Sequence, residues 1–145
     1  MHGIWGKEDE VLLRSLKPDA VLFVGDLSEG DLRLVKTIPE LPFPTAVILG
    51  NHDRGKDSTG GLLRAQLNVL GDIHCGWRLR KWQLPTLSVV GARPCSPGGG
   101  FYISKAMESV YGQISIHESA NRIYLASKEA PKNCPLIVLA HSGPT

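Results

Sequence analysis

The chain has 145 residues, of which 42% are hydrophobic and 21% are charged; a chain of this size and composition can bury its own core, which excludes general disorder. The formal net charge is +2, from 16 basic and 14 acidic residues, and the absence of any block of like charges argues against a nucleic-acid-binding stripe. No run approaches the ~20 apolar residues of a membrane-spanning helix.

The first half of the chain predicts two helix and strand pairs. A helix is expected over Lys7–Lys17, because acidic residues occupy its first turn and Pro18 follows it. The apolar runs Ala20–Val24 and Thr45–Leu49 are short and partly β-branched, which is typical of strands buried on both faces of a sheet. A further helix is expected between them, at about 30–38.

The second half continues this alternation. Ser115 and Glu118 form a capping-box pattern at the start of a helix, and the glycine-rich segment Arg93–Gly100 is expected to be a loop. The chain offers no convincing linker, so we expect one layered α/β domain over residues 1–145, with a central mixed sheet flanked by helices. The elements expected here are a helix at about 59–70, strands at 77–82 and 87–91, a helix at about 115–128 and a strand at 136–140.

Three of the buried-strand patterns are followed by a polar residue that can bind a metal. These residues are Asp26, Asn51 and His141. Ligand sites of open α/β sheets lie beyond the carboxyl ends of the strands, so we expect the strands to share one sheet and the three side chains to converge at its edge. A carboxylate, an amide oxygen and an imidazole suit manganese, iron or zinc.

Taken together and in order, Gly25-Asp26, Gly50-Asn51-His52-Asp53 and His141-Ser142-Gly143 resemble the motifs of the calcineurin-like metallophosphoesterases. That family carries Asp-x-His, Gly-Asp, Gly-Asn-His, a later His and Gly-His-x-His. The resemblance covers nearly the whole chain, and its middle segment is similar to the cyanobacterial and plastid-type branch. It implies the family's layered α/β fold and a centre of two divalent transition metals.

The resemblance also implies a role for each matched residue. Asp26 is expected to bridge the two metals, and Asn51 and His141 to bind the second one. His52 is expected to orient the phosphoryl group or to protonate the leaving oxygen as a general acid, and Asp53 to hold the His52 imidazole. The expected substrate is a phosphoester.

Both ends of the chain differ from the family pattern. His2-Gly3 resembles the end of the first motif, with Met1 at its middle position, so the motif's Asp and the strand before it are expected to precede Met1. The Gly-His-x-His motif is expected beyond Thr145. We therefore interpret the domain as incomplete, with His2 and Asp26 as the remaining ligands of the first metal.

Two functions from different classes follow. The first is a metal-dependent phosphoesterase that hydrolyses phosphomonoesters or phosphodiesters, with its activity impaired in the truncated chain. The second is a non-catalytic truncated isoform or interaction module that keeps a partial metal site. The sequence does not indicate the substrate, the metal or the oligomeric state.

Several other polar patterns are interpreted as structural. Asp72 and His74 have the letters of an Asp-x-His motif but follow no core strand, so both are expected on the surface, as is His117. The cluster Arg78, Arg80 and Lys81 is interpreted as a solvated strand face rather than a phosphate-binding patch. The segment Arg93–Gly100 lacks the lysine and serine of a P-loop and is expected to form a rim loop.

The cysteines and the first residues indicate the compartment. Cys75, Cys95 and Cys134 are odd in number and far apart, which gives neither a disulfide framework nor a paired-cysteine zinc motif. The N-terminal residues lack the basic and apolar regions of a signal peptide. A reducing, intracellular location is expected, in the cytoplasm or the plastid stroma.

Overall fold

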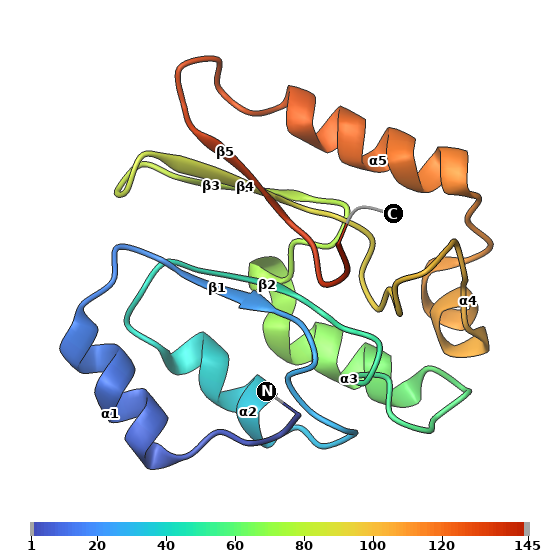
Figure 1. Ribbon diagram of the computed structural model, residues 1–145, viewed down its shortest axis with the longest axis horizontal. Helices are drawn as coiled ribbons and strands as arrows, with labels where there is room; N and C mark the ends of the chain where they lie inside the picture. The colour runs from blue at the N-terminus through green and yellow to red at the C-terminus, as the bar shows by residue number, and fades with distance from the viewer. Residues whose placement is uncertain (1, 144–145) are drawn as a thin grey trace.

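Two small sheets form the centre of the structure, a computed structural model that describes residues 2–143, and helices lie on their outer sides (Figure 1). This arrangement confirms the expected α/β class. In chain order, the elements are α1 (Lys7–Leu16), β1 (Val21–Val24), α2 (Arg33–Thr37), η1 (Ile38–Glu40), β2 (Thr45–Ile48), α3 (Gly61–Leu70), η2 (Gly71–Ile73), β3 (Leu79–Trp82), β4 (Leu87–Gly91), α4 (Lys105–Tyr111), α5 (Ile116–Lys128) and β5 (Leu136–Leu139).

The first sheet consists of β1 and β2, which run parallel with Val21 opposite Thr45 and Val24 opposite Ile48. All four residues of β2 are buried. Their side chains alternate between two cores, as the period of two in a strand requires. Val47 packs into the core that α2, α3 and α4 cover, whereas Ala46 and Ile48 pack into a smaller core beneath the second sheet.

The second sheet has the order β3-β4-β5. Its strands β3 and β4 are antiparallel, and β4 and β5 are parallel with Ser88 opposite Leu136. The expectation that β1, β2, β4 and β5 share one sheet is therefore wrong. A two-sheet arrangement still brings the ends of β1, β2 and β5 to one place, as the next subsection describes.

The segment His74–Gly76 explains why the sheets remain separate. The amide of Cys75 donates to the carbonyl of Val47 over 2.8 Å, and the amide of Gly91 donates to the carbonyl of Cys75 over 3.1 Å. This segment therefore occupies the backbone groups through which β2 and β4 could pair with each other. A Cβ atom on Gly91 would overlap the Cys75 carbonyl group, so the close crossing requires glycine at this position.

The helices follow the sequence patterns with two differences. The expected helix at 30–38 is shorter and continues into the 3-10 turn η1, which contains Pro39. The helix α4 was not expected from the sequence, because it has only seven residues and its two buried ones, Ala106 and Met107, are adjacent and give no helical period. In α5, Ser115 accepts a hydrogen bond from the Glu118 amide at 3.1 Å, as its capping pattern predicts. Within residues 2–143, no helix has the length and apolarity needed to cross a membrane.

Candidate metal centre

The ends of β1 and β2 place Asp26 and Asn51 side by side. These strands are parallel, so the residues that follow them lie at the same edge. Asp26 has a φ of 51°, in the left-handed region where Asp and Asn are among the few tolerated residues. A Cβ atom on Gly50 would overlap the Asp26 carboxylate, and one on Gly25 would lie 2.6 Å from His141 Nδ1. The two glycines therefore allow the three strand ends to approach one another.

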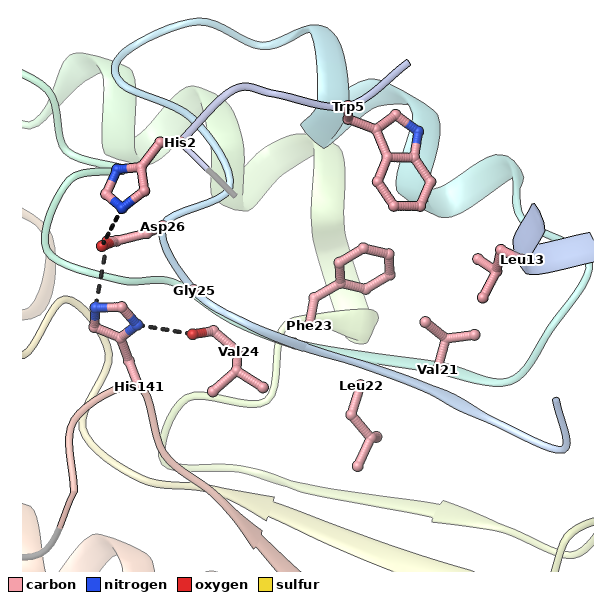
Figure 2. Close-up of a pocket in the computed structure, with 10 residues that line it drawn as sticks. All are labelled: His2, Trp5, Leu13, Val21, Leu22, Phe23, Val24, Gly25, Asp26 and His141. Carbon is pink, nitrogen blue, oxygen red and sulfur yellow. Dashed lines mark hydrogen bonds and ion pairs between the residues drawn. The ribbon is translucent and has the colours of Figure 1, made fainter. Parts of the chain in front are cut away.

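His141 comes from the other sheet and completes this group (Figure 2). Its Nδ1 atom lies 2.7 Å from the carbonyl oxygen of Val24, and its Nε2 atom lies 3.1 Å from Asn51 Oδ1 and 3.3 Å from Asp26 Oδ1. A carbonyl oxygen only accepts hydrogen bonds, so Nδ1 carries a proton and donates it. In the neutral imidazole, Nε2 then carries a lone pair, and this lone pair faces the oxygen atoms of Asn51 and Asp26.

With the Asn51 amide oxygen turned toward the ring, three electron-rich atoms converge here, and a positive charge at or between them would relieve their repulsion. A protonated imidazole or a metal ion would each supply that charge. The mixture of imidazole nitrogen, amide oxygen and carboxylate oxygen is the donor set that manganese, iron and zinc accept. The Nδ1–H bond to Val24 is also the outer contact that commonly orients a metal-binding histidine. The residues present therefore fit a divalent transition metal.

The second oxygen of Asp26 faces His2. His2 Nε2 lies 3.6 Å from Asp26 Oδ2, so the two oxygens of one carboxylate point to different histidines, His2 and His141. The side-chain ligand atoms of His2, Asp26 and His52 all lie within 4.8 Å of one another. The rings of His2 and His52 meet edge-on, with their centroids 4.9 Å apart. Asp26 therefore lies between His2 on one side and His141 on the other.

Glu29 belongs to this centre and was not singled out in the sequence. One of its carboxylate oxygens lies 3.3 Å from His2 Nδ1 and 3.7 Å from His52 Nδ1. A carboxylate beside Nδ1 accepts a hydrogen bond from that nitrogen and orients the ring, so that Nε2 is the nitrogen left to face a metal or a substrate. The only signal for it in the sequence is an acidic residue three positions after Asp26, in the same loop, and nothing in that spacing specifies the contact.

Asp53 connects the two loops that carry the centre. Its side chain is fully buried, and its oxygens accept hydrogen bonds from the amides of Ser28, at 2.8 Å, and Gly50, at 2.7 Å. Burial raises the pKa of the Asp53 carboxyl, the amide hydrogen bonds oppose this shift, and the charge of Asp26 adds to it. Within residues 2–143, the hydrogen bonds of the Asp53 carboxylate are to backbone amides, whereas the carboxylates near the His52 ring are those of Glu29 and Asp26.

A groove of about 480 Å³ leads away from the centre along β1. Figure 2 shows His2, Asp26 and His141 at one end of this groove and the apolar side chains of Trp5, Leu13, Val21 and Phe23 along the rest of it. Among the described lining residues, the carboxylate and the imidazoles therefore lie at the end formed by the strand termini.

The loop at Arg93–Gly100 lies beside the centre. The Cys95 amide donates to the carbonyl of Leu49 over 2.6 Å, and the Ser142 hydroxyl donates to the Ser96 hydroxyl over 2.8 Å. These bonds fasten the loop next to Asn51 and His141. Arg93 donates to Ser96 and to the carbonyls of Gly100 and Tyr102, so its guanidinium is held within the loop itself.

The other polar residues singled out in the sequence lie elsewhere. Asp72 and His117 are exposed, as expected. The expectation that His74 is a surface residue is wrong, because its side chain is only 4% exposed. The sequence did not indicate this burial, which follows from the pairing of the His74–Gly76 segment between the sheets. Neither Asp72 nor His74 is part of the group formed by His2, Asp26 and His52.

Comparison with known proteins gives one result that covers the whole chain. The family model of the calcineurin-like phosphoesterases (Metallophos) matches residues 1–145. No curated protein and no solved structure matches the chain. The family match agrees with the order of the Gly-Asp, Gly-Asn-His and His motifs at the strand ends and with the α/β architecture. The chain therefore belongs to the calcineurin-like phosphoesterase family.

Proposed function

We propose that this chain carries a metal-dependent phosphoesterase site, which hydrolyses phosphomonoesters or phosphodiesters. The observation that carries the proposal is the convergence of three side chains: Asn51 Oδ1 and Asp26 Oδ1 lie 3.1 Å and 3.3 Å from His141 Nε2. A cluster of this kind calls for a cation, and membership of the family supplies the class of reaction.

The donor atoms divide into two groups that share Asp26. Asn51, His141 and Asp26 Oδ1 would hold one divalent transition metal, and His2 and Asp26 Oδ2 would hold a second. Bound divalent metals polarise phosphoryl oxygens and neutralise the charge that develops on them. The donor set suits manganese, iron or zinc.

His52 is proposed as the proton donor to the leaving oxygen. Its side chain is 48% exposed beside the metal-binding residues, so an incoming phosphoester can reach it. Glu29 lies on the Nδ1 side of the same ring, which directs Nε2 toward the substrate. Asp53 keeps the loops of Ser28 and Gly50 at a fixed separation through its two amide contacts.

The number of ligands sets the expected strength of this site. Three protein groups are the usual minimum for a stable centre, and the group around His141 reaches that number. The group around His2 reaches it only if His52 binds the metal rather than the substrate, an arrangement that the 4.8 Å cluster allows. We therefore propose that residues 1–145 alone bind one metal well enough to detect and hydrolyse phosphoesters weakly.

The alternative is a non-catalytic module that keeps a partial metal site. The observation that favours it is the same small number of ligands around His2. Under this alternative the chain binds a metal and hydrolyses neither phosphomonoesters nor phosphodiesters, and His52→Ala changes nothing that can be measured.

Metal titration combined with a hydrolysis assay distinguishes these functions. The purified chain is titrated with Mn²⁺ or Zn²⁺ in a calorimeter and assayed with p-nitrophenyl phosphate and bis(p-nitrophenyl) phosphate. We expect binding of one ion and slow hydrolysis that EDTA abolishes, with His52→Ala removing hydrolysis and keeping metal binding. Hydrolysis that survives His52→Ala would contradict the role of His52, and failure to bind either metal would contradict the centre itself.

A further inference from the structure

A glutamine lies on the buried side of α3, among apolar residues. The buried residues of this helix are Leu63, Gln66 and Leu70, at the i, i+3 and i+7 positions of an apolar stripe. The Gln66 side chain is fully buried, and its Oε1 atom has no hydrogen-bond partner within residues 2–143. A buried polar atom without a partner costs free energy that leucine or methionine would avoid. This cost points to a role for Gln66 other than filling the core.

The nitrogen of the same amide holds the loop that follows β2. Gln66 Nε2 donates a hydrogen bond to the backbone carbonyl of Asp53. A carbonyl oxygen only accepts hydrogen bonds, so the NH₂ group is the end of the amide that faces the loop. The bond therefore joins the middle of α3 to the residue that directly follows Asn51 and His52.

The Asp53 carbonyl belongs to the central peptide of a tight turn. The amide of Gly55 donates to the carbonyl of His52 over 2.8 Å, which closes a four-residue turn over 52–55. The orientation of the central peptide, between Asp53 and Arg54, distinguishes one type of turn from another. The carboxylate of Asp53 is fixed separately, by the amides of Ser28 and Gly50. Gln66 therefore supplies the contact that holds the peptide of this turn.

The turn begins beside two groups of the candidate metal centre. The amide of His52 donates to Asp26 Oδ1 over 3.0 Å, and Asn51, the residue before it, places its Oδ1 atom 3.1 Å from His141 Nε2. A movement of the turn would shift both contacts, because they depend on adjacent residues of the same backbone. The bond from α3 thus acts on the metal-binding atoms through the turn.

We propose that Gln66 is a positioning residue of the metal centre. It holds the turn at 52–55 so that the His52 amide remains on Asp26 and Asn51 directs its oxygen toward the metal. The proposal rests on the proposed function, because the centre that Gln66 positions is the phosphoesterase site. The unpaired Oε1 atom is the cost in stability of placing a donor at this buried position.

The first test measures amide hydrogen exchange in EDTA, so its result depends on neither metal binding nor hydrolysis. Gln66→Met keeps the length of the side chain and removes both polar atoms. We expect the His52 and Gly55 amides to exchange about fivefold faster or more, while the amides of α5 exchange as in the wild type. The melting temperature should change by less than about 4 °C, since removal of the unpaired Oε1 offsets the lost hydrogen bond.

The second test measures Zn²⁺ affinity by calorimetry. Gln66→Met should bind Zn²⁺ about tenfold more weakly than the wild type, as expected when a contact that orients metal ligands is lost. The control is Leu70→Ala, at a buried residue of the same stripe. This change should lower the melting temperature more than Gln66→Met does, and it should leave the Zn²⁺ affinity unchanged. A general loosening of α3 would weaken metal binding in both variants.

Gln66→Glu tests the hydrogen bond itself by rescue. Burial favours the neutral form of a carboxyl group, whose O–H can donate to the Asp53 carbonyl in place of the amide. At pH 6 we expect the exchange of the His52 and Gly55 amides to match the wild type. As the pH rises and the carboxyl ionises, the carboxylate can only accept hydrogen bonds, so the protection of these amides should fall below that of the wild type.

Two results would overturn the proposal. The first is wild-type exchange of the His52 and Gly55 amides in Gln66→Met, together with no dependence on pH in Gln66→Glu relative to the wild type. The second is equal Zn²⁺ affinity in Gln66→Met and the wild type. A wild-type chain that binds no Zn²⁺ would instead contradict the proposed function, and the exchange measurements in EDTA would still decide whether Gln66 holds the turn.

Discussion

The imidazole of His141 lies 3.1 Å from the amide oxygen of Asn51, although 90 positions separate the two residues in the chain. They reach each other from different sheets, at the carboxyl ends of β5 and β2. Because the other nitrogen of the same ring is committed to the Val24 carbonyl, the nitrogen near Asn51 is the one available to a metal. This pair, with Asp26, is the part of the centre on which the first prediction rests.

Replacement of Asp26 by Asn should abolish metal binding without unfolding the protein. Asn tolerates the left-handed backbone conformation that this position has, but it removes the negative charge and one of two ligand oxygens. We expect Mn²⁺ or Zn²⁺ affinity to fall by more than about 100-fold, since even outer contacts of metal ligands are typically worth roughly 10–100-fold. Calorimetry measures this, and exposed Asp72→Asn serves as the matched control. Equal affinities in the two variants would exclude Asp26 as a ligand.

Replacement of Glu29 by Gln should weaken the metal centre less severely. The change keeps the size of the side chain but removes the charge beside His2 and His52, which loosens the orientation of both rings. Metal affinity should fall about tenfold, and slow hydrolysis should fall with it. Glu40→Gln, at another exposed glutamate, is the control. An unchanged affinity in Glu29→Gln would mean that the contacts of this exposed carboxylate do not orient the histidines.

Replacement of Asp53 by Asn should destabilise the fold. The two buried oxygens accept from two backbone amides, and an NH₂ group in place of one oxygen would face a donor and leave an amide without a partner. The loss should be about 1–3 kcal/mol in the free energy of unfolding, measured by urea denaturation. The exposed Asp19→Asn change should have little effect, and a loss in Asp53→Asn no larger than in this control would contradict the proposed structural role.

Burial of His74 should make stability depend on pH between about 6.5 and 4. Its pKa in the folded protein is about 4, below the usual value of 6.5, so in this window the unfolded chain binds a proton that the folded chain does not. Stability from this group is complete above pH 6.5 and falls by about 3 kcal/mol as the pH drops to 4. Unfolding free energies measured in EDTA should show this loss in the wild type.

The His74→Gln variant isolates this contribution. It removes the titrating group while the carboxylates and the other histidines are unchanged, so the difference between the two pH profiles belongs to His74. The variant's profile should be flatter by the same amount over this window. Parallel profiles would mean that His74 gains a proton in the folded protein as easily as in the unfolded chain.

The sequence by itself determined the strands and the residues that follow them. The apolar runs that became β1, β2 and β5 are bounded by glycine and polar residues, so local composition was enough to place Asp26, Asn51 and His141 at strand ends. Local signals also specified the start of α5, because the Ser115 cap depends only on residues three positions apart. The family followed from the order of these motifs.

The tertiary structure alone decided how the strands pair and what each side chain meets. The His74–Gly76 segment separates β2 from β4 and buries His74, and Glu29 contacts two histidines from loops far away in the chain. Asp53 likewise bonds to backbone amides from two loops rather than to its neighbour His52. A strand pattern specifies burial and alternation but not the partner, because sheet hydrogen bonds join backbone groups that are alike in every residue. Side-chain contacts depend on that pairing, so they are fixed only when the chain has folded.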